Sequence, residues 1–276
     1  MSTISLCSDF IAQSSDTWFR IRNGRLTRIY ISEESITDYN LLTLQMKHPH
    51  QISTQKFTKH MESIHGADWE WWLGSKAGWL GLRVQAKKLN SRTLRYSGLD
   101  HVTSKGRQID LLINHSMSGY PPKIPIYVFY NYWDTRRHVP PWLCCSYHRA
   151  YDMLGCGLSD AHLIRATLNQ GNKDLKHISS TMYPWSCLVC CHQNSQKRKN
   201  RPLANRTLSF FANMPQKIPK EPDFKPYEEQ RFIVKEAPYY VYRIMEGFRL
   251  SEEEWEEIGV RRIATIYEPS HDNNSN

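Results

Sequence analysis

Two short segments with strand character, Gly66–Trp72 and Leu82–Lys88, place the strongest constraint on this chain. Side chains alternate between the two faces along a strand, so Gln85 and Lys87 share one face of the second segment. Asp68 lies in the first segment. Pairing the two segments as a hairpin brings a carboxylate, an amide oxygen and an ammonium group within a few ångströms of one another.

The residue types in this cluster suit work on a phosphate group. Mg²⁺ prefers hard oxygen ligands, usually one or two carboxylates with waters, and Asp68 and the Gln85 side-chain carbonyl provide such oxygens. Lys87 is a point charge that can hold an attacking water and stabilise developing negative charge. The plainer interpretation is an Asp–Lys ion pair beside an amide on a solvated strand.

The aromatic and acidic neighbours of Asp68 divide between the two faces of the same strand. Glu70 shares the face of Asp68 and is either a further metal ligand or a residue at the rim of the site. Trp69 and Trp71 point the other way, which favours core packing. Trp72 is on the Asp68 face and is the candidate for stacking on a base.

Elements around the cluster predict an α/β fold. Ser32 is expected to cap a helix from Glu33 to about Lys47, with an apolar stripe of Ile36, Tyr39, Leu42 and Met46. A strand is expected over Ile52–Thr58, a helix near Gly106–Met117, and a strand over Ile124–Asn131 that is apolar throughout, as in a sheet covered on both faces.

The flanking regions carry weaker signals. The expected features are a helix within residues 5–30 with a turn near Asn23-Gly24, a helix over 159–169 capped by Ser159, a helix from Pro238, an acidic helix capped by Ser251, and a strand over Val260–Tyr267. Residues 193–226 are polar, basic and proline-bearing, and predict a long exposed loop or inserted segment.

The strings around the cluster resemble an uncharacterised bacterial family over roughly residues 30–265. They are Gly66–Trp72, Val84–Lys87, Gly106–Gln108, Tyr127–Asn131 and Trp185–Cys190. An acid on one strand followed by Gln-x-Lys on the next also resembles the PD-(D/E)xK restriction-endonuclease-like superfamily, in its Mrr-type variant.

That second resemblance implies a core of a helix, three antiparallel strands, a helix and a parallel strand. We assign this core to residues 30–135 of a single domain spanning 1–276, with residues 136–276 as an elaboration carrying the exposed basic loop. The implied activity is hydrolysis of phosphodiester bonds in DNA with Mg²⁺ or Mn²⁺, in a role such as restriction or defence against phage.

The resemblance also implies roles for particular residues. An acid from the first helix joins the metal ligands Asp68 and Gln85, and by position this is Glu34, with Glu33 as the fallback. Otherwise these acids simply favour the helix N-terminus. Gln108 lies where related nucleases place a polar residue near substrate, unless it is simply solvated. Gln85 replaces the more common carboxylate and removes one negative charge from the site.

The charge balance agrees with a polyanionic partner. The chain has a formal net charge of +9 and an isoelectric point near 9.2. Arg136, Arg137, Lys197 and Arg198 are candidate phosphate contacts, or otherwise lie in solvated loops.

Seven cysteines, at 7, 144, 145, 156, 187, 190 and 191, form no secreted disulfide framework, so reduced thiols are expected. Cys187 and Cys190 have the spacing of zinc ligands, but Cys144 and Cys145 are adjacent. Buried structural thiols are therefore favoured over a Zn²⁺ site.

No apolar run is long enough to cross a bilayer, and no secretory signal is visible, so a cytoplasmic protein is expected. DNA is the expected partner, with a homodimer or a defence partner protein also open. Two other classes remain: a catalytically inactive nucleic-acid-binding or assembly protein with this fold, and an enzyme acting on RNA or a small nucleotide.

Overall fold

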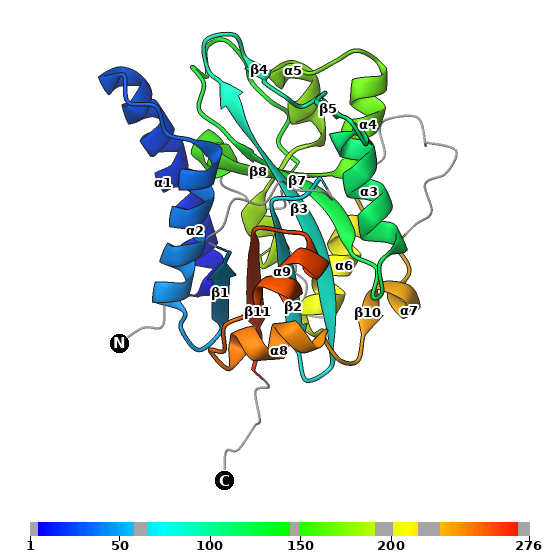
Figure 1. The fold of residues 1–276 in the computed structure, drawn as a ribbon. Helices are drawn as coiled ribbons and strands as arrows, with labels where there is room; N and C mark the ends of the chain where they lie inside the picture. The colour runs from blue at the N-terminus through cyan, green and yellow to red at the C-terminus, as the bar shows by residue number, and fades with distance from the viewer. Residues whose placement is uncertain (1–4, 58–65, 144–149, 191–200, 215–226, 270–276) are drawn as a thin grey trace.

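The computed structural model describes residues 5–57, 66–143, 150–190, 201–214 and 227–269, which form a mixed sheet with helices on both faces (Figure 1). The helices are α1 (Leu6–Thr27), α2 (Glu33–Lys47), α3 (Gln108–Ser118), α4 (Ala161–Asn169), α5 (Leu175–Ile178), α6 (Leu203–Ala212), α7 (Glu229–Phe232), α8 (Tyr239–Met245) and α9 (Glu252–Ile258). The strands are β1 (Ile52–Lys56), β2 (Trp69–Ser75), β3 (Gly78–Asn90), β4 (Arg95–Tyr96), β5 (Val102–Thr103), β6 (Gly106–Arg107), β7 (Ile124–Tyr130), β8 (Cys156–Asp160), β9 (Tyr183–Pro184), β10 (Ile233–Val234) and β11 (Arg262–Tyr267). Short 3₁₀ turns are η1 (Tyr151–Gly155), η2 (Ser179–Thr181) and η3 (Trp185–Leu188).

The predicted α/β class is confirmed. The main sheet runs in the order β1-β11-β2-β3-β7-β8-β9, with β4 and β10 also paired to β3. Strands β2 and β3 form the predicted antiparallel hairpin, and β7 lies parallel to β3. A helix, α3, separates β3 from β7 in the chain, as a parallel connection requires.

The three strands of the expected core, β1, β2 and β3, are not all neighbours in the sheet. Strand β1 does alternate in direction with β2 and β3, but it pairs with β11 and not with β2. Strand β11 lies between β1 and β2 and is parallel to β2. Strands that follow one another in the chain usually pair, but here a strand from the end of the chain lies between β1 and β2.

The C-terminal half of the chain is part of the sheet that carries the predicted core. Strand β11 supplies one of its inner strands, and β8 and β9 extend it beyond β7. Figure 1 shows β11, in dark red, beside β2 within the sheet. One continuous sheet therefore joins residues 30–135 with the region after them.

Helices cover both faces of the sheet, as the apolar β7 segment predicts. All seven residues of β7 are buried. One core gathers under α1, α2 and α6 around Trp71 and Trp185, and a second gathers under α3, α8 and α9 around Trp255. Among the described residues, no helix has the length and apolar character needed to cross a membrane.

Helix α2 begins and ends where the sequence predicts, with the Ser32 side chain accepting the Ser35 N–H. Its buried face is different from the predicted stripe. Ile36 is buried, but Tyr39, Leu42 and Met46 are exposed. The face packed on the protein also carries polar groups, since the Thr37 hydroxyl bonds to Tyr130 at 2.7 Å and Asn40 Oδ1 accepts from Gln13 at 2.7 Å. Satisfied buried polar residues are invisible to a search for apolar periodicity.

Three further expectations are corrected. Helix α1 runs through Gly24 without the predicted turn; a Cβ at Gly24 would lie 2.8 Å from the Ile29 carbonyl oxygen, so glycine permits this close approach. The cap of α4 is Asp160, which accepts the His162 N–H, and not Ser159. Part of the predicted 193–226 loop is the packed helix α6, whose buried residues include Leu208 and Phe211.

The expectation of reduced thiols is wrong for one pair. Cys7 and Cys190 form a disulfide that joins the start of α1 to the residues after η3. Cys156 and Cys187 are buried thiols that take no part in a disulfide, as predicted for structural thiols. The positions 144, 145 and 191 lie outside the described residues.

Candidate active site

Asp68 lies one residue before β2 and is fixed to the neighbouring strand by backbone contacts. Its N–H donates to the Val84 carbonyl at 2.8 Å, and its Oδ2 accepts the Ala86 N–H at 2.8 Å. The Gln85 side-chain amide also donates to Oδ2. The hairpin therefore brings Asp68 and Gln85 together, as their places on the two segments predict.

A close approach of backbone helps to place Asp68. Gly66 has a φ of 72°, and a Cβ there would lie 2.6 Å from the Gln108 carbonyl oxygen. Only glycine adopts this conformation without strain and allows the chain to pass so near the start of α3. The Gly66-Ala67-Asp68 segment consequently lies against the helix that begins at Gln108.

Lys87 completes the predicted set from the next position on the same face of β3. It is 7% exposed, and its Nζ donates to Gln108 Oε1 at 2.9 Å. A Cβ at Gly98 would lie 3.9 Å from Nζ, so the loop after β4 borders the ammonium group. Gln108, the first residue of α3, thus lies beside the cluster as expected and orients Lys87.

The helical acid at the cluster is Glu33, the fallback, and not Glu34. Glu33 Oε1 accepts the Lys88 N–H at 2.7 Å. The Glu34 carboxylate instead pairs with Arg261, with 58% of its side chain exposed. Glu33 faces the cluster because it lies one helical turn before Thr37, which is on the buried face of α2.

The two carboxylates are held in an environment that opposes their ionisation. Burial raises the pKa of Asp68, while the Ala86 N–H and Lys87 act against that rise. Burial also raises the pKa of Glu33; the Lys88 N–H and the Lys87 charge lower it, and the nearby Asp68 charge raises it again. A cation bound between the two acids would relieve this cost.

The donor set fits a hard divalent cation. Asp68 and Glu33 offer carboxylate oxygens, and Gln85 Oε1 is a buried acceptor without a hydrogen-bond partner in the described part of the chain. Among the described residues no group of three or more His, Cys, Asp or Glu side chains could hold a metal. A site here would therefore use two carboxylates and an amide oxygen, which suits Mg²⁺ because it keeps several waters.

Two neighbours proposed for the site lie elsewhere. Glu70 is fully buried and pairs with Arg83 at 2.8 Å, so it is neither a ligand beside Asp68 nor a rim residue. Trp72 is also fully buried and donates its indole N–H to Glu70 at 3.0 Å, which leaves no face for a base. Both follow from helices α3, α8 and α9 covering this face of the sheet.

Of the four predicted phosphate contacts, Arg136 and Arg137 lie within the described residues. Arg136 is exposed and pairs with Asp134 at 2.7 Å. Arg137 is exposed and donates to the carbonyls of Ser91 at 3.2 Å and Arg92 at 3.1 Å. Lys197 and Arg198 lie outside the described residues.

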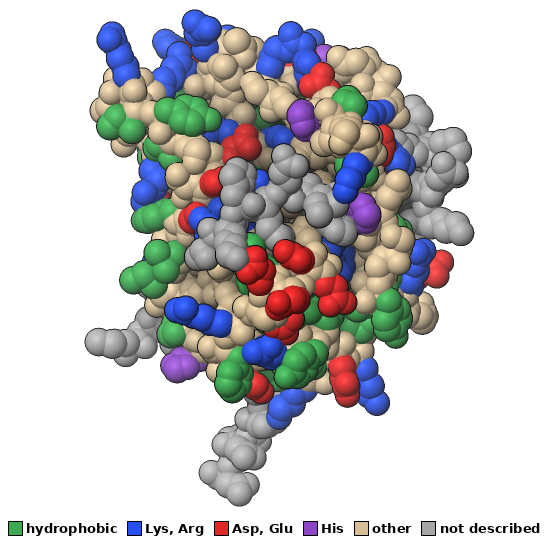
Figure 2. All heavy atoms as spheres, viewed as in Figure 1, with side chains coloured by type: hydrophobic (Ala, Val, Ile, Leu, Met, Phe, Trp, Pro, Cys, Tyr) green, Lys and Arg blue, Asp and Glu red, His purple; other side chains and the backbone are tan. Residues whose placement is uncertain are grey.

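Sequence reasoning missed a hollow of about 280 Å³ beside Glu33. Its lining includes Arg25, Tyr30 and Lys88, and Lys88 Nζ lies 4.0 Å from the centre of the Tyr30 ring. Arg25 and Lys88 line the hollow, and Arg137 donates to the carbonyl of the lining residue Ser91. We group them with the exposed arginines of the neighbouring chain segments at the end of α1 and around β4, and call the set the basic rim: Arg22, Arg25, Arg28, Lys88, Arg92, Arg95 and Arg137. Figure 2 shows Lys and Arg side chains along the upper edge of the molecule, where α1 ends and β4 lies.

Comparison with known proteins places the chain in a family without adding an activity. No curated protein and no solved structure matches it. One family model, described as a family of unknown function (DUF6615), matches residues 6–272. Because this match covers nearly the whole chain, the protein belongs to the DUF6615 family.

Proposed function

We propose that this protein is a metal-dependent nuclease that hydrolyses phosphodiester bonds, with DNA as its substrate. The observation that carries the proposal is the convergence of Asp68, Gln85, Lys87 and Glu33 from β2, β3 and α2. A carboxylate pair, an unsatisfied amide oxygen and a buried ammonium are the groups that metal-assisted attack on a phosphate needs.

The chain's own residues divide the work. Asp68, Glu33 and Gln85 Oε1 would hold Mg²⁺ or Mn²⁺, which supplies Lewis-acid charge to the phosphate oxygens when bound. Lys87, kept in place by Gln108, orients the attacking water and stabilises the negative charge that develops on phosphorus oxygens. The buried surroundings of Lys87 strengthen this interaction because they exclude water.

The basic rim supports a nucleic acid as the substrate. Two of its residues line the hollow beside Glu33, so a phosphate backbone bound there would lie next to one acid of the cluster. Contacts between such side chains and phosphates position a backbone without selecting bases. A role in restriction or defence is the setting that a DNA nuclease of this kind fits.

The first experiment incubates purified protein with supercoiled plasmid, with and without Mg²⁺ or Mn²⁺. Asp68→Ala is compared with Asp100→Ala, which removes an exposed acid that pairs with Lys173 at the surface. Metal-dependent nicking that only Asp68→Ala abolishes supports the proposal. Single-stranded DNA and RNA in parallel reactions identify the preferred polymer.

The contrary result is equally clear. If wild type cuts no polymer with either metal but retains DNA in a salt-sensitive way, and Asp68→Ala retains it equally, the nuclease proposal is wrong. The protein is then a nucleic-acid-binding member of this fold. The replacement of a carboxylate by Gln85 is the feature that would explain such a loss of activity.

A further inference from the structure

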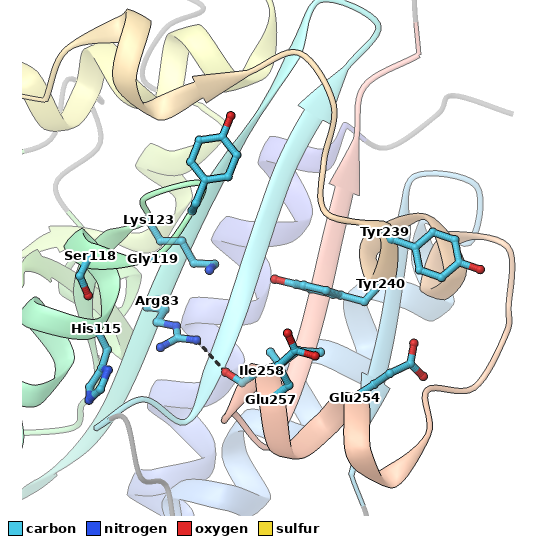
Figure 3. Close-up of a pocket in the computed structure, with 11 residues that line it drawn as sticks. Arg83, His115, Ser118, Gly119, Lys123, Tyr239, Tyr240, Glu254, Glu257 and Ile258 are labelled. Carbon is cyan, nitrogen blue, oxygen red and sulfur yellow. Dashed lines mark hydrogen bonds between the residues drawn. The ribbon is translucent and has the colours of Figure 1, made fainter.

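A second pocket, of about 530 Å³, opens on the same face of the sheet as Asp68 but towards the other end of β3. It lies between the C-terminal end of α3, the loop before β7, and helices α8 and α9 (Figure 3). This volume is in the range of pockets that hold small-molecule ligands. The proposed nuclease chemistry uses none of its residues.

The floor of the pocket contains two buried cations. Arg83 is 5% exposed and Lys123 is 7% exposed, and both line the cavity. Behind them Glu70 is fully buried, 2.8 Å from Arg83 Nε and 3.4 Å from Lys123 Nζ. Two positive side chains therefore share one carboxylate.

Glu70 is saturated by donors and stays ionised. Its Oε2 accepts from the Trp72 indole at 3.0 Å and from the Tyr240 hydroxyl at 2.7 Å. Burial alone would raise the pKa of Glu70, but Lys123 and Arg83 outweigh it and bring the pKa to about 2. The floor therefore holds two basic side chains for one carboxylate, and burial, together with the Arg83 charge, lowers the pKa of Lys123 against the pull of Glu70.

An anion that enters the pocket would lie against both basic side chains and add a counter-charge beside Glu70. Arg83 already donates Nη2 to the Ile258 carbonyl at 2.7 Å, which fixes its guanidinium plane. Figure 3 shows the Lys123 ammonium and the Tyr240 hydroxyl pointing into the same space. The Tyr240 hydroxyl already donates its hydrogen to Glu70, so the donors available to a compact oxyanion are the Lys123 ammonium and the remaining N–H groups of Arg83.

The mouth of the pocket has the opposite charge. Glu254 and Glu257 of α9 line it, and Tyr239 is 74% exposed beside them. Figure 2 shows the acidic side chains gathered on this part of the surface. A nucleic-acid strand would be repelled there, whereas a small molecule with a neutral or positive remainder would not.

We propose that this pocket binds a small ligand through one compact anionic group, a phosphate or a carboxylate, held by Arg83 and Lys123. The neutral or cationic remainder of the ligand lies against Tyr239, Tyr240 and the acidic mouth. This proposal does not depend on the nuclease activity, since it concerns a separate group of residues.

The test measures binding by calorimetry in the presence of EDTA, so that no metal contributes. The probes are inorganic phosphate, adenosine monophosphate, acetate and L-arginine, which separate a phosphate from a carboxylate as the bound group. We expect one class to bind wild type. Lys123→Met should weaken that binding about tenfold or more, because a charged hydrogen bond is lost.

Three variants locate the site. Ser118→Trp fills the pocket from an exposed position without touching the floor, and should also abolish binding. Lys176→Met, an exposed lysine on α5, is the charge-matched control and should bind as wild type does. Lys87→Met should retain binding, because Lys87 belongs to the other cluster.

Several outcomes would overturn the proposal. One is the absence of binding by every probe to folded wild type. Another is equal binding by wild type and Ser118→Trp. This comparison does not need Lys123→Met, so it decides the question even if that variant does not fold. Loss of binding in Lys87→Met would place the anion at the candidate active site instead.

Discussion

Glu33 Oε1 accepts the backbone N–H of Lys88 at 2.7 Å, so the first residue of α2 is tied to the strand that carries Lys87. This direct contact with the β3 backbone holds the Glu33 carboxylate at the Asp68 cluster. It also separates Glu33 from its neighbour Glu34, which pairs with Arg261 at the surface. The two adjacent acids are therefore a matched pair for testing the site.

We expect Glu33→Gln to lower metal-dependent cleavage by about tenfold or more, since it removes an ionised oxygen from the metal site. Glu34→Gln should leave the rate within about twofold, because an exposed ion pair contributes little. The measurement is the initial rate of plasmid nicking over a range of Mg²⁺ concentrations. A larger loss of cleavage in Glu34→Gln than in Glu33→Gln would assign the metal to Glu34.

Asp68→Asn is expected to stabilise the metal-free protein at neutral pH. The folded state raises the Asp68 pKa by burial, so ionisation costs stability as pH rises above the unfolded value. Removing that ionisation should therefore raise the melting temperature of the metal-free protein at neutral pH. Thermal unfolding in EDTA at several pH values measures it.

The pH series also provides the control for this variant. Below the unfolded pKa of an aspartate both proteins are uncharged at position 68, so the difference should disappear there. Mg²⁺ should raise the melting temperature of wild type and not that of Asp68→Asn. A wild type that is more stable than the variant at neutral pH without metal would contradict the prediction.

Glu70→Gln should destabilise the protein strongly, because Arg83 and Lys123 would lose their buried counter-charge. Lowering the Glu70 pKa from 4.5 to about 2 corresponds to about 3 kcal/mol at neutral pH. That contribution is complete above pH 4.5 and is lost as pH falls towards 2. The variant should therefore show a flatter decline of unfolding free energy across this range.

Denaturant unfolding at a series of pH values tests this prediction. Glu256→Gln, on an exposed face of α9, is the control for loss of one acidic charge and should behave as wild type does. An equally steep acid decline in Glu70→Gln and wild type would show that Glu70 does not govern it.

The basic rim should determine how nucleic-acid binding depends on salt. Replacing Arg28 and Arg92 with serine is expected to weaken DNA binding and to lower the slope of log affinity against log salt by about 2, one for each lost phosphate contact. Lys235 and Arg249 are exposed cations near α8 and serve as a double control. An unchanged slope in the rim variant would exclude this surface.

The sequence predicts the hairpin and its cluster well because the pattern there is local. Strand alternation alone places Asp68 beside Gln85 and Lys87, and the hairpin needs no distant contact. Pairing of β1 with β11 depends on a segment that follows every other element of the sheet. No local pattern contains that information, so the predicted strand order lacked it.

Position in the superfamily pattern predicts Glu34, whereas the phase of α2 in the fold points Glu33 to the cluster. The predicted stripe of α2 used Tyr39 and Met46, which are exposed, while Thr37 and Asn40 face the interior. A stripe drawn through the buried polar residues turns the helix enough to point Glu33 inwards. Burial of Trp72 and Glu70 was missed for a different reason, because helices from the C-terminal half cover that face.

The position of β11 affects how the protein can be made. Strand β2 has β3 on one side and β11 on the other, so an edge of β2 stays open until residues 262–267 have been synthesised. Asp68, one residue before β2, accepts the Arg261 N–H through its carbonyl at 3.2 Å, so it gains this support only after the other strands of the sheet have been synthesised. A nascent protein that is complete up to α9 would hold every proposed catalytic residue, yet it would not hold them in a finished fold.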